Sequence, residues 1–248
     1  MPAGPGGCEA AGGCRYCHLM PGPHAPDRFP GEPGVAVGVR AAYDAVARAY
    51  HDQLGDELAG KPLDRAVLRA FTELAGAGTI ADVGCGPGHV TRFLAARQAR
   101  VIGIDVSAGM IAVAREHAPA LAFAVGSMLA LPVADGACSG VLALYSIIHL
   151  TAGERALACR EFARVVRSGG WLLAAFHVDS PDFAAGQVNH LTTWFGQAVE
   201  LDGYFLEPAS VVRDVEAAKF TVSATVTRLP RPDFEYPSRR CYLLAQRH

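Results

Sequence analysis

The residues best suited to chemistry in this sequence surround a glycine-rich segment, Ala81-Asp82-Val83-Gly84-Cys85-Gly86-Pro87-Gly88. It follows a short apolar run typical of a buried parallel strand and precedes a helical pattern. Glycines in such a loop let the backbone approach a ligand closely, and the start of the helix offers unpaired N–H groups. The segment therefore predicts a ligand site at the end of a strand, although glycine-rich turns also arise without a ligand.

A second chemical group is Asp105, which ends the apolar segment Val101-Ile102-Gly103-Ile104 nineteen residues after Gly86. A carboxylate at the end of the neighbouring strand can accept two hydrogen bonds from a ribose 2′,3′-diol. A plain surface acid is the alternative interpretation. The order strand, glycine loop, helix, strand and acid predicts a site for an adenosine-containing ligand.

Two details separate this site from one for a nicotinamide dinucleotide. The spacing from Gly84 to Gly88 is Gly-x-Gly-x-Gly, whereas the dinucleotide fingerprint requires Gly-x-Gly-x-x-Gly to admit a pyrophosphate. Asp82, directly before the loop, would repel a pyrophosphate but can help to hold a cationic ammonium group. These features favour S-adenosylmethionine, which carries an ammonium and a sulfonium and no phosphate, over NAD as the cofactor.

Alternating apolar and helical segments predict the elements that position these residues. The expected strands are 79–84, 100–104, 121–125, 138–145, 169–176, 219–228 and 241–245. The expected helices are 88–97, 107–117, 153–167 and 208–217, after two amphipathic helices around 39–50 and 63–74. Such alternation implies βαβ crossovers. We expect an α/β fold with a doubly wound, mostly parallel seven-stranded sheet and helices on both faces, a Rossmann-like architecture.

The chain divides by composition into a tail and a domain. Residues 1–34 contain eight Gly and seven Pro, which predicts a flexible tail because too little apolar surface is present to offset ordering entropy. Residues 35–248 are expected to form the domain. The segment 177–207, rich in aromatic and amide side chains, interrupts the alternation after the fifth strand. We interpret it as a lid-like insertion over a binding site, with a purely structural cap as the alternative.

The tail also contains a cysteine cluster. Cys8, Cys14, Cys17 and His18 could ligate zinc, since Cys-x-x-Cys is a usual half-site, but no well-spaced second pair accompanies it. The tail matches the Cys-x-x-Cys-His haem attachment pattern literally, yet that chemistry needs export. The favoured interpretation is therefore free thiols and no bound metal.

Composition excludes several classes of partner. The formal net charge of −2, with few and scattered Lys and Arg, disfavours nucleic acid, whose binding depends on many cationic contacts to phosphate. No apolar run approaches the roughly 18 residues of a membrane-spanning helix. The N-terminus lacks the pattern of a signal peptide. We expect a cytoplasmic protein that contacts neither nucleic acid nor membrane; its oligomeric state stays open.

From about Val35 onward the chain resembles the class I S-adenosylmethionine-dependent methyltransferases, particularly the small-molecule type common in actinobacteria. The segment Asp82–Gly88 looks like the first motif of that family, and Gly103-Ile104-Asp105-Val106-Ser107 like the second. Arg164–Gly170 is similar to the Arg-Val-Leu-x-Pro-Gly-Gly turn before the fifth strand. Tyr43–Tyr50 is similar to the leading helix, which often covers the cofactor.

The resemblance implies roles for individual residues. Gly84, Gly86 and Gly88 would line the methionine part, Asp105 would bind the ribose and Met110 would pack near the adenine. Ser127 stands where the family usually has an aspartate that contacts the adenine amine. The complete cofactor set is Tyr50, Asp82, Gly84, Cys85, Gly86, Gly88, Asp105, Val106, Met110, Gly126, Ser127, Met128 and Leu144.

The acceptor side is less defined by sequence. Methyl transfer from a sulfonium is an in-line displacement that needs a general base only when the acceptor is protonated. The candidate bases are His149 and His177, and Tyr43, Tyr145 and Tyr204 are candidates for the substrate pocket; packing is the alternative for each. We expect methyl transfer to a small-molecule acceptor. The alternatives are an NAD-dependent oxidoreductase and a non-catalytic S-adenosylmethionine-binding protein.

Overall fold

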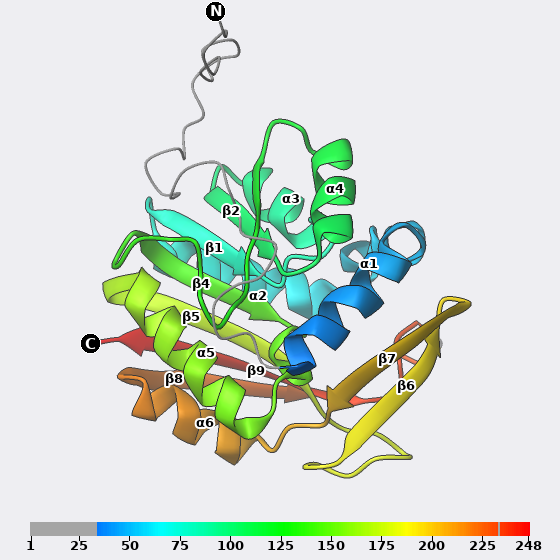
Figure 1. Ribbon diagram of the computed structural model, residues 1–248. Coiled ribbons are helices and arrows are strands. Elements are labelled where there is room, and N and C mark those ends of the chain that lie inside the picture. The colour runs from blue at the N-terminus through cyan, green and yellow to red at the C-terminus, as the bar shows by residue number, and fades with distance from the viewer. Residues whose placement is uncertain (1–33, 233) are drawn as a thin grey trace, which may run out of the picture.

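Short apolar segments pair into one sheet in the order β3-β2-β1-β4-β5-β9-β8 in the computed structural model, which describes residues 34–232 and 234–248 (Figure 1). The strands are β1 (Thr79–Val83), β2 (Arg100–Asp105), β3 (Ala122–Val125), β4 (Cys138–Leu144), β5 (Val166–Asp179), β8 (Phe220–Arg228) and β9 (Arg239–Arg247). Strands β1 to β5 are parallel, and β9 runs antiparallel to both β5 and β8. The predicted doubly wound, mostly parallel sheet is confirmed.

Helices cover both faces of the sheet, as predicted. They are α1 (Gly34–Leu54), η2 (Glu57–Gly60), α2 (Pro62–Ala75), α3 (His89–Ala95), α4 (Ala108–His117), η3 (Ile147–His149), α5 (Ala152–Val165) and α6 (Pro208–Ala217). Successive strand residues point to opposite faces. Thus Leu142 packs with α2 and α3 around Phe71, whereas its neighbour Val141 packs with α5 and α6 around Phe162.

Local sequence signals explain where several helices begin. Pro62 occupies the first turn of α2, where its missing N–H costs nothing. The Ser107 hydroxyl caps α4 by accepting a hydrogen bond from the Met110 N–H at 3.0 Å. Thr151 and Glu154 form a capping box at the start of α5.

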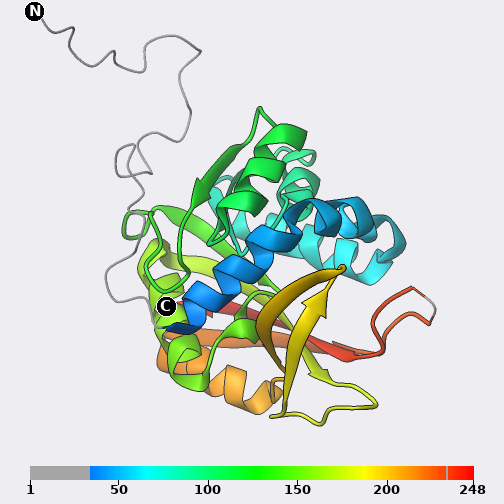
Figure 2. The same cartoon turned by 45° about the vertical axis from the view of Figure 1, so that its right-hand side comes forward.

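The segment after β5 contains a feature that the sequence analysis did not predict, a two-stranded antiparallel hairpin of β6 (Val188–Trp194) and β7 (Gln197–Tyr204). Its turn is Phe195-Gly196, and both residues have positive φ, 47° and 76°. Such turns match the twist of paired strands. Helix α1 packs against α4 on one side and against β7 on the other (Figure 2).

The strand order indicates the edge of the sheet at which a ligand binds. The chain moves outward from β1 to β2 and β3 and then returns to β4 on the other side of β1. Ligands in such sheets bind at the carboxyl ends of the strands beside this reversal. No helix within the described part of the chain is long and apolar enough to cross a membrane.

Candidate active site

A pocket opens at the carboxyl ends of β1, β2 and β4, and the space between its walls measures about 1130 Å³, part of it open solvent. The residues predicted for the site that line it are Tyr43, Tyr50, Asp82, Gly84, Cys85, Gly86, Asp105, Val106, Gly126, Ser127, Met128, Leu144, Tyr145 and His149.

The glycine loop approaches the pocket with backbone rather than side chains. Gly86 has φ of 53°, and a Cβ atom added there would meet no atom within 4 Å, so its backbone is open to a ligand. Gly84 has φ of 74°, and a Cβ there would overlap the side chain of Ser146 at the end of β4. The loop thus requires glycine at one position for close packing and at the other for ligand access.

Asp105 is buried at the end of β2 and is held in place by the backbone. Its Oδ2 accepts the Gly86 N–H at 2.8 Å and its Oδ1 accepts the Ser107 N–H at 2.9 Å. Each oxygen keeps a further lone pair for a ligand hydroxyl. Burial raises the pKa of Asp105 to about 6, against the opposing effect of these hydrogen bonds. A diol that donated to both oxygens would stabilise the ionised form.

Two further carboxylates line the same end of the pocket. Asp82 accepts a hydrogen bond from the Thr91 hydroxyl at 2.6 Å, and burial raises its pKa to about 6. Burial also raises the pKa of Glu57, but hydrogen bonding to His89 and the charge of Lys61 outweigh it and bring the pKa to about 2. Glu57 was missed by the sequence analysis because η2 carries no motif. Anionic groups here suit a cationic ammonium ligand.

The residues after β3 form the far wall of this end. Ser127 is buried, and its Oγ accepts the Leu129 N–H at 3.2 Å, so its own O–H remains able to donate to an adenine nitrogen. The residues present fit S-adenosylmethionine, because an open glycine backbone, a diol acceptor and cation-compatible carboxylates line one pocket.

Two predicted cofactor residues do not line the pocket. Gly88 faces Phe123 and Ala114, so it serves the close packing of α4 against the sheet. Met110 is fully buried in a cluster with Ala42 and Val199, and it therefore joins α4 to α1 and the hairpin. Both residues make packing contacts behind the site.

His149 lies at the opposite end of the pocket, and its hydrogen bonds define its tautomer. Its Nδ1 lies 2.6 Å from the carbonyl oxygen of Asp202 on β7, and a carbonyl can only accept, so the proton is on Nδ1. Its Nε2 lies 2.7 Å from the hydroxyl of Tyr43 on α1 and accepts that O–H. Burial lowers the pKa of His149, which keeps the imidazole neutral.

His177 and Tyr204, also predicted for the site, do not line the pocket. His177 Nδ1 lies 2.6 Å from the Ser238 hydroxyl, and the ring stacks on Tyr145 at 5.0 Å between centroids. Burial, with the charges of Arg240 and Lys61, lowers its pKa to about 3. His177 supports the pocket wall from behind, because β5 runs past the end of β4. Tyr204 packs against the core at the base of the hairpin.

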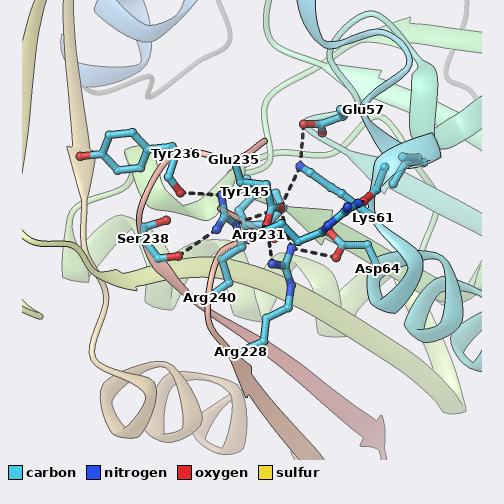
Figure 3. A network of polar contacts seen from close by, with 12 residues as sticks. Glu57, Lys61, Asp64, Tyr145, Arg228, Arg231, Glu235, Tyr236, Ser238 and Arg240 are labelled. Carbon is cyan, nitrogen blue, oxygen red and sulfur yellow. Dashed lines mark hydrogen bonds and ion pairs between the residues drawn. The ribbon is translucent and has the colours of Figure 1, made fainter. Parts of the chain in front are cut away.

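A buried network of charges lies behind the acceptor end, far from any sequence motif (Figure 3). Arg228 donates two hydrogen bonds to Glu235, at 2.6 and 2.7 Å, and a third to Asp64 at 2.9 Å. Lys61 Nζ lies 2.6 Å from Glu57 and 3.6 Å from Glu235. The sequence offered no signal for this network, since Arg228 and Asp64 are 164 positions apart.

Tyr145 connects the network to the pocket. It has φ of 53°, unusual for a residue with a side chain, and it directly follows β4. Its hydroxyl lies 2.9 Å from that of Tyr242, which accepts a hydrogen bond from Arg228 Nε at 3.1 Å. Strained backbone of this kind is concentrated at ligand sites, where surrounding contacts hold it.

The Asp44 carboxylate joins α1 to the start of α4. Asp44 Oδ1 accepts the Ser107 hydroxyl at 2.6 Å and the Gly109 N–H at 2.8 Å. Both donors lie at the N-terminus of α4, which favours negative charge. This contact positions Tyr43 beside His149.

The structure contains no group of three His, Cys, Asp or Glu side chains suited to a metal ion among residues 34–232 and 234–248. The candidate zinc residues Cys8, Cys14, Cys17 and His18 lie outside the described residues. The cysteines at 85, 138, 159 and 241 are free and buried.

The fold is Rossmann-like, with a pocket at the carboxyl ends of its central strands. A model of the methyltransferase domain matches residues 80–170. The ubiquinone/menaquinone biosynthesis C-methyltransferase UbiE of Rubrivivax gelatinosus is 31% identical over 186 residues, covering 68% of this chain and 70% of that protein. The trans-aconitate 2-methyltransferase of Paracidovorax citrulli is 36% identical over 104 residues, covering 41% of this chain and 40% of that protein.

A structural comparison agrees with this fold. Magnesium protoporphyrin IX methyltransferase from Synechocystis PCC 6803, solved with bound S-adenosylmethionine, has a TM-score of 0.62 at 19% identity, over 89% of this chain and 100% of that chain. At that identity the likeness shows the fold alone. The chain spans 40% to 61% of the length of three curated relatives, among them the trans-aconitate enzyme. The chain belongs to the class I S-adenosylmethionine-dependent methyltransferases.

Proposed function

We propose that this protein binds S-adenosylmethionine at the glycine-loop end of the pocket and transfers its methyl group to a small molecule at the other end. The observation that supports the proposal is one pocket lined by Gly86 and Asp105 after β1 and β2 and by Tyr145 and His149 after β4, on the other side of β1, with Tyr43 of α1 in the same lining. When bound, S-adenosylmethionine supplies an already activated methyl group. The protein then mainly has to align the acceptor and exclude water.

In this proposal each end has its own task. Asp105 accepts the ribose hydroxyls, while Asp82 provides negative charge for the ammonium group. His149 is the general base, since its neutral imidazole faces the pocket. The family relationship supports the cofactor, and the free buried cysteines are consistent with a cytoplasmic protein. NAD is disfavoured because a pyrophosphate would face these carboxylates.

Calorimetric titration of S-adenosylmethionine, S-adenosylhomocysteine and NAD into the full chain tests the proposal. We expect micromolar binding of the first two and none of NAD. Asp105→Ala should weaken binding about 100-fold, because hydrogen bonds to a charged group contribute about 1.5–3 kcal/mol each. Glu216→Ala is the control, since Glu216 is an exposed acid on α6 outside the pocket. Binding of NAD alone, or equal binding by the Asp105 variant, would contradict the proposal.

A further inference from the structure

The pocket has an uneven charge distribution that constrains its acceptor. Its lining includes the carboxylates of Glu57, Asp64, Asp82 and Asp105, and none of the described residues that line it is a lysine or an arginine. Asp82 and Asp105 lie at the cofactor end. Glu57 and Asp64 are ion-paired with Lys61 and Arg228, so an anionic acceptor would meet no unpaired lysine or arginine among the described residues of the pocket wall.

The cations nearest to the acceptor end are already paired. Lys61 lies between Glu57 and Glu235, and Arg228 joins Asp64 to Glu235 (Figure 3). These ion pairs balance the charges of Lys61 and Arg228 within the wall behind the pocket. A carboxylate or phosphate on the acceptor would be desolvated without a partner, which costs several kcal/mol. The acceptor end suits an uncharged molecule.

The same end contains one polar pair whose protons are ordered. The Tyr43 O–H donates to His149 Nε2 at 2.7 Å, and the Nδ1–H of His149 donates to the Asp202 carbonyl at 2.6 Å. These three residues come from α1, η3 and β7, so the pair is complete only when the helix and the hairpin are in place. Both Tyr43 and His149 line the pocket. The Tyr43 oxygen keeps a lone pair that can accept a proton from a bound molecule.

We propose that the acceptor is an uncharged phenol and that the Tyr43–His149 pair takes its proton during methyl transfer. This inference rests on the proposed function and specifies the substrate class of the same site. The phenolic oxygen forms a bond to the methyl carbon, and the carbon–sulfur bond breaks with its electron pair moving to sulfur. The phenolic proton passes to the Tyr43 oxygen while the Tyr43 proton passes to His149 Nε2. The products are a methyl ether, S-adenosylhomocysteine and an imidazolium at His149, which loses its extra proton through Tyr43 to water.

A phenol is the acceptor whose proton this pair can best take. Burial raises the pKa of Tyr43 well above its ordinary value, so Tyr43 stays protonated and passes a proton on to His149 rather than holding a charge. A phenol, with an ordinary pKa of about 10, is the most acidic of the uncharged hydroxyl acceptors. An aliphatic alcohol is far less acidic, and a carboxylate has no proton to give. The rings of Tyr43, Tyr50 and Tyr145 line the pocket and provide flat apolar surface for an aromatic acceptor.

The geometry of the pair can be tested by nitrogen NMR on full-length protein labelled in its nine histidines. His149→Gln assigns the resonance. We expect a neutral His149 with the proton on Nδ1, and Tyr43→Phe should shift its Nε2 resonance. Tyr50→Phe is the matched control, because this second tyrosine of α1 also lines the pocket without bonding to His149. A proton on Nε2, or no shift in Tyr43→Phe, would overturn the inference.

The acceptor class can be tested with two probes of similar size, 4-methylphenol and 4-methylbenzoate, titrated into protein with and without saturating S-adenosylhomocysteine. We expect 4-methylphenol to bind at least about tenfold more tightly, because the carboxylate is left unpaired, and Tyr43→Phe to weaken only 4-methylphenol, by about tenfold. With S-adenosylmethionine, 4-methylanisole should form, and Tyr43→Phe should lower kcat more than it changes KM.

The outcomes separate the two proposals. If S-adenosylhomocysteine does not bind, the proposed function fails, and the inference about the acceptor fails with it. If it binds while 4-methylbenzoate binds as tightly as 4-methylphenol, or 4-methylphenol does not bind, the inference about the acceptor fails and the proposed function stands.

Discussion

The two ends of the pocket are built in different ways. The cofactor end is contributed by successive strand–loop–helix units, so Asp82, Gly86, Asp105 and Ser127 follow one another along the chain. The acceptor end combines distant segments, and the contact of Tyr43 with His149 joins positions 106 apart. A ligand site made from consecutive units leaves a pattern in the sequence, whereas a site made by tertiary packing leaves none.

The ends also differ in how their charges are held. Asp105 is fixed by backbone N–H groups, which the loop and helix geometry supplies regardless of distant residues. Behind the acceptor end, Glu235 depends on Arg228 and Lys61 from other parts of the chain. The cofactor end should therefore tolerate single changes outside its motifs better than the acceptor end does.

The largest expected effect comes from breaking the buried network. Glu235→Gln removes a carboxylate that is 1% exposed and leaves Arg228 poorly compensated. We expect a loss of about 3–5 kcal/mol in the free energy of unfolding, measured by urea denaturation. Glu116→Gln, which breaks the exposed pair with Arg48, should leave the midpoint unchanged. Equal midpoints for both variants would show that the network does not stabilise the acceptor end.

Gly84→Ala tests the contact between the glycine loop and Ser146. The added Cβ combines a positive φ with overlap at Ser146, for a cost of about 2–4 kcal/mol in the free energy of unfolding. Gly169→Ala is the matched control, because Gly169 has φ of 75° with no atom within 4 Å of the added Cβ, and we expect about 1 kcal/mol. Similar losses in both variants would mean that contact with Ser146 contributes little.

The cofactor end should respond to pH. Its ligand donates hydrogen bonds to ionised Asp105, whose pKa burial raises to about 6. Below pH 6, binding must first remove a proton, so the Kd of S-adenosylhomocysteine should rise about tenfold per pH unit, with Asp82 adding to the effect. Asp105→Asn should flatten the Asp105 part of this dependence in calorimetry. An affinity that does not change between pH 7 and pH 5 would contradict the assignment.

The same pKa shifts have the opposite effect on the ligand-free protein. A carboxyl whose pKa is raised on folding binds its proton more tightly in the folded state. Asp82 and Asp105 therefore oppose folding above pH 6, and this contribution disappears as the pH falls from about 6 to 4. The thermal stabilisation by S-adenosylhomocysteine should consequently shrink over the same pH range.

The smallest effect concerns the attachment of α1. Asp44→Ala removes the acceptor for Ser107 and Gly109 at the start of α4, for which we expect a loss of about 1 kcal/mol in the free energy of unfolding. Hydrogen exchange should rise in α1 and β7 more than in β1. Unchanged exchange in α1 would show that the apolar contacts around Val46 hold the helix without Asp44.

The sequence predicted the sheet and the glycine-loop end because their signals are local. The strand patterns, the loop and Asp105 each depend on neighbours within a few residues or within one βα unit. It did not predict the β6–β7 hairpin, since its alternating pattern is interrupted and its turn, Phe195-Gly196, is not the usual Asn-Gly.

Residues at the acceptor end were harder to place. His149 and His177 looked alike in the sequence, each following a strand, yet one lines the pocket and the other lies behind Tyr145. Met110 was expected near the adenine but turns toward α1. In each case packing between distant elements decides the outcome, and a single sequence does not contain that information.

The most direct test of the account is a crystal structure of the protein with S-adenosylhomocysteine. We expect density along the glycine loop, with both ribose hydroxyls within hydrogen-bond distance of the Asp105 carboxylate and the sulfur facing Tyr43 and His149. Density at another site, or a sulfur directed away from Tyr43, would contradict it.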